Sequence, residues 1–247
     1  MSRIQNAFKK GKAFITFVTA GDPNLETTEK LVFEMEKSGA DIIELGIPFS
    51  DPIAEGPVIQ AANLRSLASG TTVNKIFDMV KHIRKKSQVP LVFLTYANPV
   101  FKYGYDAFFK KCKEVGVDGI IIPDLPFEEQ SEIPNRHGID LIPLVAPTSE
   151  DRIKKIAAVA EGYLYVVSSL GVTGIRSEIK TDLKSIIDIA RKTAKVPIAV
   201  GFGINTPEQA AKISKIADGV IVGSAIVKII AEKKSVGKYV AKMKEAI

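Results

Sequence analysis

A short unit recurs along this chain and limits the folds open to it more than any other feature. In each copy a glycine or alanine is followed within two residues by an aspartate, and a wholly apolar run then begins. The copies lie at 39–41, 116–118, 138–140 and 217–218. Small residues tolerate the backbone conformation in which many helices end. Continuous apolar runs are typical of parallel strands buried on both faces. The unit therefore predicts repeated passages from a helix into a buried strand.

Further apolar runs complete a set of strands that alternate with amphipathic segments. The predicted strands begin at Ala13, Ile42, Leu91, Gly119, Leu141, Tyr163, Ile198 and Val220. The predicted helices cover 25–38, 72–86, 105–115, 128–136, 150–160, 183–193, 207–216 and 236 to the C-terminus. Eight strand-then-helix units predict an α/β fold, a (β/α)8 TIM barrel that takes up residues 1–247 as a single domain.

Charge and cysteine content narrow the class of function. The net charge of +6 suits an anionic small molecule. The cationic runs at 81–86 and 228–234 fall on or near predicted helices, so we expect no nucleic-acid partner. The single cysteine, Cys112, excludes an internal disulfide and a thiolate metal cluster, and we expect no metal site. Because the N-terminus lacks a signal-type apolar stretch and no run reaches about 18 apolar residues, we expect a soluble, cytoplasmic protein without membrane contact.

The stretch from Ile42 to Pro57 presents two carboxylates. Glu44 lies within an apolar strand, where burial of a charge is costly. Glu55 follows in a loop that three prolines stiffen. We interpret the two as acids that face one another at the end of the strand. The alternative is a structural glutamate paired with a lysine.

Glycines follow the last strands of the predicted barrel, where such barrels commonly hold phosphate. Gly203 comes after the seventh strand, and Gly223 and Ser224 come after the eighth. Glycine lets backbone N–H groups approach an anion, and a helix that starts at Ser224 directs its positive end towards it. Gly174, in the long loop after the sixth strand, is a further candidate for the phosphate site. Each motif alone is also compatible with an ordinary turn.

Several motifs together resemble the tryptophan synthase alpha chain family, from about Ile4 to the C-terminus. They are Phe17–Pro23, Glu44–Pro52, Tyr96–Pro99, Gly171–Gly174 and Gly201–Ile204. The resemblance implies a lyase of tryptophan biosynthesis, which cleaves indole-3-glycerol phosphate to indole and D-glyceraldehyde 3-phosphate by a retro-aldol reaction. It also implies a pyridoxal-phosphate-dependent beta subunit as partner in an alpha2-beta2 complex. No cofactor is expected on this chain, because PLP belongs to the beta subunit.

The same resemblance implies roles for individual residues. Glu44 is expected to shuttle protons at indole C3 and at the glycerol hydroxyl, and Glu55 to bind N1–H. Tyr165 is expected to hydrogen-bond a carboxylate or the substrate. The residues expected to contact the substrate are Phe17, Ile59, Leu94, Ile121, Thr173 and Phe202, for most of which core packing is the alternative. The residues expected to contact the beta subunit are Asp51, Pro52, Asn98 and Asp124.

The chain departs from the family pattern at Glu55, where family members normally carry aspartate. Glutamate keeps the carboxylate, but its longer side chain displaces that group by one methylene. We therefore expect slower turnover than in an aspartate version. Three alternatives remain open at this point: a weakly active or non-catalytic regulatory subunit, a free-standing lyase, and another phosphate-binding barrel. The last includes phosphoribosylanthranilate isomerase and indole-glycerol-phosphate synthase, although the chain has no lysine at a strand end for a synthase.

Overall fold

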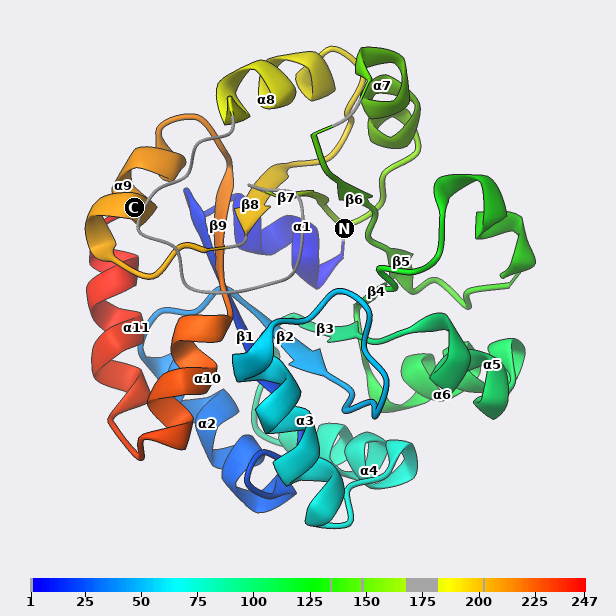
Figure 1. Cartoon of the computed structure of the whole chain (residues 1–247), viewed down its shortest axis with the longest axis vertical. Helices are drawn as coiled ribbons and strands as arrows, with labels where there is room; N and C mark the ends of the chain where they lie inside the picture. Colours follow the sequence, from blue (N-terminus) through cyan, green and yellow to red (C-terminus); the bar gives the residue numbers. More distant parts are fainter. Residues whose placement is uncertain (1, 134, 148, 168–181, 202) are drawn as a thin grey trace.

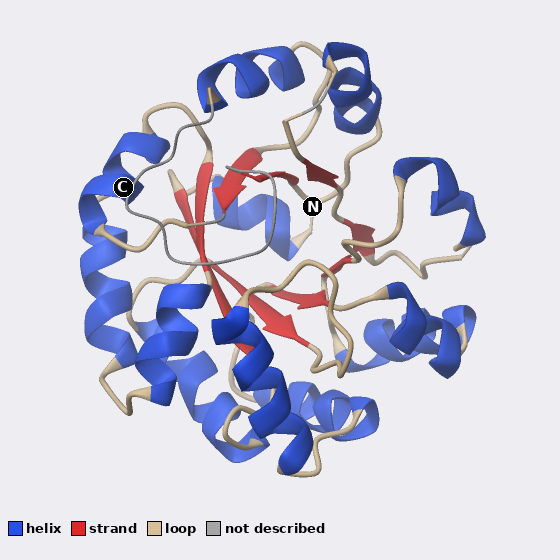
Figure 2. Cartoon of the chain, viewed as in Figure 1, coloured by secondary structure: helices blue, strands red, loops and turns tan. Residues whose placement is uncertain are grey.

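The strands form a parallel sheet that curls into a barrel at the centre of the molecule, and the helices surround it (Figures 1 and 2). The computed structural model describes residues 2–133, 135–147, 149–167, 182–201 and 203–247. The strands are β1 Ala13–Thr19, β2 Ile42–Gly46, β3 Leu91–Leu94, β4 Gly119–Ile121, β5 Asp140–Leu141, β6 Leu144–Val145, β7 Leu164–Val167, β8 Ile198–Gly201 and β9 Gly219–Val222. Their order is β5-β4-β3-β2-β1-β9-β8-β7-β6. The barrel predicted from the sequence is confirmed.

The barrel closes through a single stretch of chain. β5 and β6, at the two ends of the order, are separated only by Ile142 and Pro143. Ile142 N–H donates to Ile120 O at 2.9 Å on one side, and Tyr165 N–H donates to Pro143 O at 3.1 Å on the other. Proline has no N–H to donate, which interrupts the strand at this point. The two short strands therefore correspond to the one fifth strand that the sequence predicted.

The helices and one 3-10 segment pack around the barrel and across its ends. They are α1 Arg3–Phe8, α2 Leu25–Lys37, α3 Pro57–Ala68, α4 Val73–Ile83, α5 Ala97–Tyr103, α6 Tyr105–Val115, η1 Phe127–Glu132, α7 Glu150–Ala158, α8 Leu183–Arg191, α9 Pro207–Ser214, α10 Ser224–Ala231 and α11 Val236–Glu245. The sequence pattern did not predict α1, α3 or α5. None of the helices in the described part of the chain is long and apolar enough to cross a membrane.

The helix predicted at 128–136 was wrong. The chain forms the short 3-10 segment η1 there, and none of its residues is buried. The segment is almost wholly polar from Glu128 to Glu132, so it has no apolar stripe to pack against the sheet. Pro134 also disfavours a helical conformation of the residue before it.

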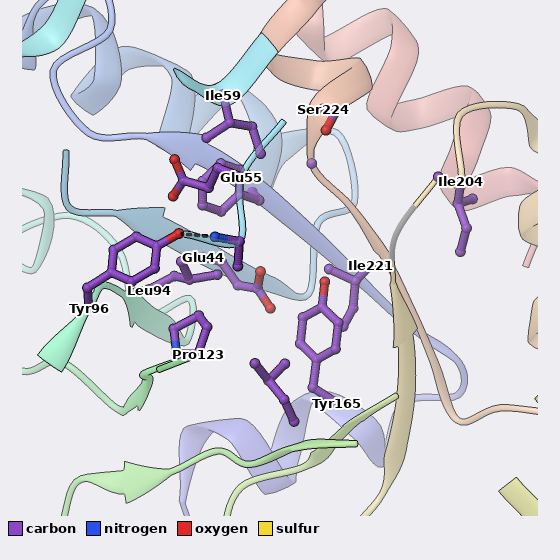
Figure 3. A pocket seen from close by; sticks show the side chains of 15 residues that line it. Glu44, Glu55, Ile59, Leu94, Tyr96, Pro123, Tyr165, Ile204, Ile221 and Ser224 are labelled. Atoms are coloured by element: carbon purple, nitrogen blue, oxygen red, sulfur yellow. Dashed lines mark hydrogen bonds between the residues drawn. The ribbon is translucent and has the colours of Figure 1, made fainter. Parts of the chain in front are cut away.

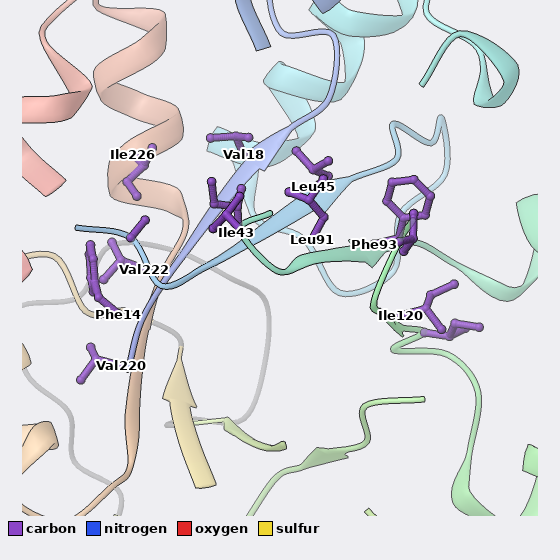
Figure 4. Packing of buried hydrophobic residues seen from close by; sticks show 14 of the residues in the cluster. Phe14, Val18, Ile43, Leu45, Leu91, Phe93, Ile120, Val220, Val222 and Ile226 are labelled. Atoms are coloured by element: carbon purple, nitrogen blue, oxygen red, sulfur yellow. The ribbon is translucent and has the colours of Figure 1, made fainter. Parts of the chain in front are cut away.

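Buried side chains form two layers, one on each side of the strands. Alternate residues point into the barrel, where Ile15, Ile42 and Ile221 belong to one cluster. The residues between them point outwards to the helices, as Val18, Leu45 and others do in Figure 4. This two-sided burial explains why the strands are continuously apolar in the sequence.

Carboxylates at the amino ends of the strands tie neighbouring strands together. In four places a side chain before one strand accepts a hydrogen bond from the first residues of its neighbour and also pairs with a cation. The bonds are Phe14 N to Asp41 Oδ2 (2.7 Å), Leu91 N to Asp118 Oδ2 (2.9 Å), Leu141 N to Glu161 Oε2 (2.9 Å) and Ile198 N to Asp218 Oδ2 (2.9 Å). The cations are Lys244, Arg84 with Arg3, Arg136 and Arg191. The recurrent aspartates of the sequence are thus mostly structural clamps.

Replacement of Asp118 by alanine should destabilise the barrel by about 3 kcal/mol or more, because it leaves the buried Arg84 guanidinium without its partner. Denaturant unfolding at neutral pH measures the change. The matched control is Glu26→Ala, which breaks the exposed pair with Lys30 and should change stability far less, because water screens that pair. Equal effects of the two substitutions would contradict the structural role of Asp118.

Candidate active site

Glu44 enters the barrel from the middle of β2. It pairs in register with Phe17 of β1 on one side and Val92 of β3 on the other, and only 1% of its surface is exposed. Its Oε1 accepts a hydrogen bond of 2.6 Å from the hydroxyl of Tyr163, next to β7. Burial raises the pKa of Glu44 to about 7, and the bond from Tyr163 opposes that rise. The carboxyl group can therefore both donate and accept a proton near neutral pH.

Glu55 reaches the same region from the loop between β2 and α3, and 7% of its surface is exposed. Asn63, two turns along α3, donates to its Oε2 at 2.6 Å. The Tyr96 hydroxyl accepts a hydrogen bond from the backbone of Ala54 at 3.3 Å, which fixes the loop next to Glu55. Burial raises the pKa of Glu55 to about 7, against the hydrogen bonds from Asn63 and Tyr96.

A cavity at the carboxyl end of the barrel brings both acids together (Figure 3). Its lining residues come from eight of the nine strands or from the segments that follow them, and most are apolar. They are Phe17, Glu44, Ala54, Glu55, Ile59, Leu94, Tyr96, Pro123, Leu144, Tyr165, Gly203, Ile204, Ile221, Gly223 and Ser224. No described lining residue is cationic. An apolar cavity with a few polar groups suits a flat aromatic ring.

Backbone rather than charged side chains forms one side of this cavity. Gly203 has a φ of +81°, a conformation that favours glycine, and it precedes α9. Gly223 is the N-cap of α10, which begins at Ser224. The α10 N-terminus therefore presents its unpaired N–H groups next to a second glycine turn. Such an arrangement can hold an anion without a lysine or arginine.

Glycines also make room for the aromatic residues in the cavity wall. A Cβ at Gly201 would overlap the Tyr165 hydroxyl. A Cβ at Gly46 would lie 2.6 Å from Cζ of Phe17, which is too close for any side chain. The absence of side chains at the ends of β2 and β8 thus sets the positions of both rings.

Most residues that the sequence singled out line this cavity. Phe17, Glu44, Glu55, Ile59, Leu94, Tyr165, Gly203, Gly223 and Ser224 do so. Ile121 does not: it packs in the cluster inside the barrel. Thr173, Gly174 and Phe202 lie outside the described residues.

Sequence reasoning missed the residues that hold the two acids. Tyr163 and Tyr165 share one face of the strand, since they are two residues apart. Asn63 was missed because no helix was predicted after Glu55, so nothing indicated that the two would meet. Tyr96 was noted only as part of a motif.

A parallel barrel with two buried acids and glycine turns at the carboxyl ends of its strands defines the class of (β/α)8-barrel enzymes. Within that class, the family model "Tryptophan synthase alpha chain" matches residues 4–247. The chain belongs to this family, as its motifs predicted. It is therefore placed among the lyases of tryptophan biosynthesis, and the isomerase and synthase alternatives are not favoured.

Individual relatives agree with the family model. The tryptophan synthase alpha chain of Lacticaseibacillus casei is 54% identical over 237 residues, which cover 95% of this chain and 89% of the relative. The crystal structure of the alpha chain from Legionella pneumophila subsp. pneumophila matches with a TM-score of 0.89 and 40% identity, covering 100% of this chain and 97% of that one. A chain of the tryptophan synthase complex from Pyrococcus furiosus matches with a TM-score of 0.84 and 37% identity, covering 96% and 98%.

Replacement of Glu44 by glutamine should stabilise the chain at alkaline pH. A folded-state pKa of about 7, above the usual 4.5, means that the folded chain holds this proton more tightly than the unfolded chain. The contribution of Glu44 to stability therefore falls as the pH rises from about 4.5 to 7 and then stays low. The neutral amide avoids this loss, so we expect a gain on the order of 2 to 3 kcal/mol at pH 8 that disappears near pH 4.5.

Urea unfolding of both proteins at pH 4.5, 6 and 8 measures this difference. The control is Glu132→Gln, because Glu132 is an exposed glutamate on η1. A Glu44→Gln gain that is the same at all three pH values would contradict the raised pKa.

Proposed function

We propose that the cavity cleaves indole-3-glycerol phosphate to indole and D-glyceraldehyde 3-phosphate, with Glu44 and Glu55 as the reacting and stabilising acids. One observation carries the proposal: two buried carboxyl groups with a pKa of about 7 share an apolar cavity with the glycine turns at Gly203 and Gly223. The reaction needs a proton at indole C3, a hydrogen-bond acceptor at N1–H, and a base for the glycerol hydroxyl next to the breaking bond.

Glu44 acts as the general acid and then the general base. Its Oε1 is engaged by Tyr163, so Oε2 carries the exchangeable proton. Oε2 gives this proton to indole C3, which makes the ring an electron sink for the carbon–carbon bond. As that bond breaks, the hydroxyl on the departing carbon becomes the aldehyde and returns a proton to Glu44. The carboxyl group ends the cycle as it began.

Glu55 accepts a hydrogen bond from N1–H and stabilises the positive charge that develops on the protonated ring. Asn63 and Tyr96 favour the charged form of Glu55, whereas Glu44 has Tyr163 as its hydrogen-bond donor and is more deeply buried. The two carboxyl groups thus differ in burial and in their hydrogen-bond donors, and in this proposal Glu44 carries the transferred proton while Glu55 acts in its charged form.

The phosphate of the substrate binds at the glycine side of the cavity. The α10 N-terminus and the turn at Gly203 supply N–H donors, and Gly174 is proposed as a further donor. Phe17, Ile59 and Leu94 enclose the indole ring, with Thr173 and Phe202 proposed to join them and Tyr165 to hydrogen-bond a carboxylate or the substrate. Ile121 lies in the buried apolar cluster inside the barrel and supports these residues.

The beta subunit of tryptophan synthase docks at the open end of the barrel. Two large apolar side chains there are each 70% exposed: Ile53 in the loop before Glu55, and Phe101 on α5. The rings of Phe49 and Tyr96, 5.6 Å apart and inclined by 35°, join that loop to the start of α5. Asp51, Pro52 and Asn98 lie on the same two segments. Asp124 supports them, since it accepts a hydrogen bond from Ala97 N at 2.8 Å.

The proposed chemistry uses no cofactor on this chain, since side-chain carboxyl groups supply every proton transfer, and PLP belongs to the beta subunit. A cytoplasmic location follows from the same proposal, because a phosphorylated substrate does not cross a membrane unaided. The arrangement is an alpha2-beta2 complex in which indole passes to the beta subunit.

Indole release from indole-3-glycerol phosphate, with and without a tryptophan synthase beta subunit, tests the function. We expect turnover by the native chain and a fall of at least about a hundredfold for Glu44→Gln, because the amide cannot carry the proton. Glu132→Gln serves as the surface control. Absence of turnover in both settings would instead support a purely regulatory subunit.

Replacement of Glu55 by aspartate should raise turnover, on the order of tenfold or more, because it restores the family's carboxylate position relative to N1–H. Steady-state kinetics give kcat and KM for both forms. A second substitution, Glu55→Gln, removes the charge and should lower kcat. If the aspartate form is no faster than the native chain, then Asn63 and Tyr96 already place the longer side chain correctly.

A further inference from the structure

The short helix α1 lies across the amino end of the barrel (Figure 1). Ser2 caps its first turn, with Gln5 completing a capping box, and Arg3 binds Asp118 at 2.9 Å. Ile4 and Ala7 are buried in the same interior cluster as Tyr163. This helix is therefore fixed at its start and packed along its inner face.

Two strands lack a side chain at the points where α1 approaches them. A Cβ at Gly119, the first residue of β4, would lie 3.1 Å from Cδ1 of Ile4. A Cβ at Gly219, the first residue of β9, would lie 3.0 Å from Cε1 of Phe8. Both distances are tighter than ordinary contact, so the helix fits the barrel closely at both places.

Phe8 links this helix to the active site. Its ring packs against that of Tyr163, with centroids 5.9 Å apart and planes inclined by 48°. Tyr163 is completely buried, and its hydroxyl donates to Glu44 at 2.6 Å. The ring of Tyr163 thus contacts α1, and its hydroxyl contacts the carboxyl group of Glu44.

We infer that Phe8 is a positioning residue for the reaction: through Tyr163 it holds Glu44 in place and keeps water out of the barrel floor. The inference rests on the proposed role of Glu44. α1 brings no charge to the carboxyl group, since Phe8 and Ile4 are its residues on this side and Arg3 is engaged with Asp118. From the strands, Phe17 and Val92 flank Glu44 without charge, Tyr163 and Tyr165 face it from β7, and Glu55 shares the cavity.

Looser packing at the amino end of the barrel would admit water and change the proton affinity of Glu44. Burial is the main cause of the raised pKa of Glu44, so hydration of the floor returns that pKa towards 4.5. The protonated fraction at pH 7 then falls, and protonation of indole C3 becomes slower. Because the glycine turns at the opposite end of the barrel are untouched, binding of the phosphate should change little.

Phe8→Ala and Phe8→Leu, made in the full chain, test this inference. Leucine keeps apolar volume and secures a folded variant, but it loses the ring contact with Tyr163. We expect the alkaline limb of the pH–rate profile for indole release to move down by about one pH unit or more, with kcat at pH 7 reduced about tenfold and KM nearly unchanged. Phe8→Tyr, which retains a ring, should restore the native profile.

The matched control is Phe33→Ala. Phe33 is also a half-buried phenylalanine, but it lies on α2 against Lys86, outside the barrel. Its loss should lower stability without moving the pH profile. If Phe33→Ala and Phe8→Leu shift the profile equally, the effect is general loosening and the inference is wrong.

A titration of the Glu44 carboxyl group separates this inference from the proposed function. Infrared difference spectra against Glu44→Gln report its protonation without any substrate. A lower midpoint in Phe8→Leu supports the positioning role even if the native chain releases no indole, in which case only the proposed function fails. An unchanged midpoint in a folded Phe8→Leu variant overturns the inference.

Discussion

The buried hydrogen bond from Tyr163 to Glu44 inside the barrel is the interaction on which the site depends. A carboxylate in such a place would ordinarily require a cation, yet its partner here is a neutral hydroxyl. Burial and the nearby Glu44 raise the pKa of Tyr163, so this hydroxyl stays protonated and remains the donor. The barrel thus tolerates an acid whose proton is only weakly held at neutral pH. Burial of Glu44 lowers the stability of the fold, but it brings the pKa of the carboxyl group into the range that proton transfer needs.

The two ends of the barrel use the same chemical group in opposite ways. At the amino end each clamping carboxylate has both a backbone N–H and a cation, which favours its charge and joins adjacent strands. At the carboxyl end Glu44 and Glu55 have only neutral partners among the described residues of the cavity. Carboxylates that pair with a cation join the strands, whereas the two with neutral hydrogen-bond donors have raised pKa values. This division agrees with the general placement of active sites in such barrels.

Much of the fold was predictable because buried parallel strands are apolar on both faces, and the recurrent aspartates indicated where they begin. The function of those aspartates was not predictable, since the hydrogen bond from Leu91 N–H to the Asp118 carboxylate depends on the stagger between strands. Helix α3 was missed because its apolar residues occupy both faces and leave no amphipathic pattern. The prediction of a helix at 128–136 was wrong because this segment has no apolar face to pack against the sheet.

The site was predictable at the strand ends and not beyond them. Gly203 and Ser224, which line the cavity, were singled out because barrels commonly hold phosphate after their last strands. Glu44 was singled out because a charge within an apolar strand is costly to bury. The sequence singled out Tyr165 as the tyrosine next to a carboxylate and missed Tyr163, two residues earlier on the same face of the strand, whose hydroxyl donates to Glu44. Asn63 required a helix that the sequence did not reveal.

The fit of Tyr165 against Gly201 has a consequence for protein engineering. The two residues lie on neighbouring strands, and the Tyr165 hydroxyl fills the space where a side chain at position 201 would be. A bulkier residue at 201 can be accommodated only if the one at 165 shrinks. Libraries that vary these positions singly would therefore discard working pairs, and only simultaneous randomisation would recover reshaped pockets.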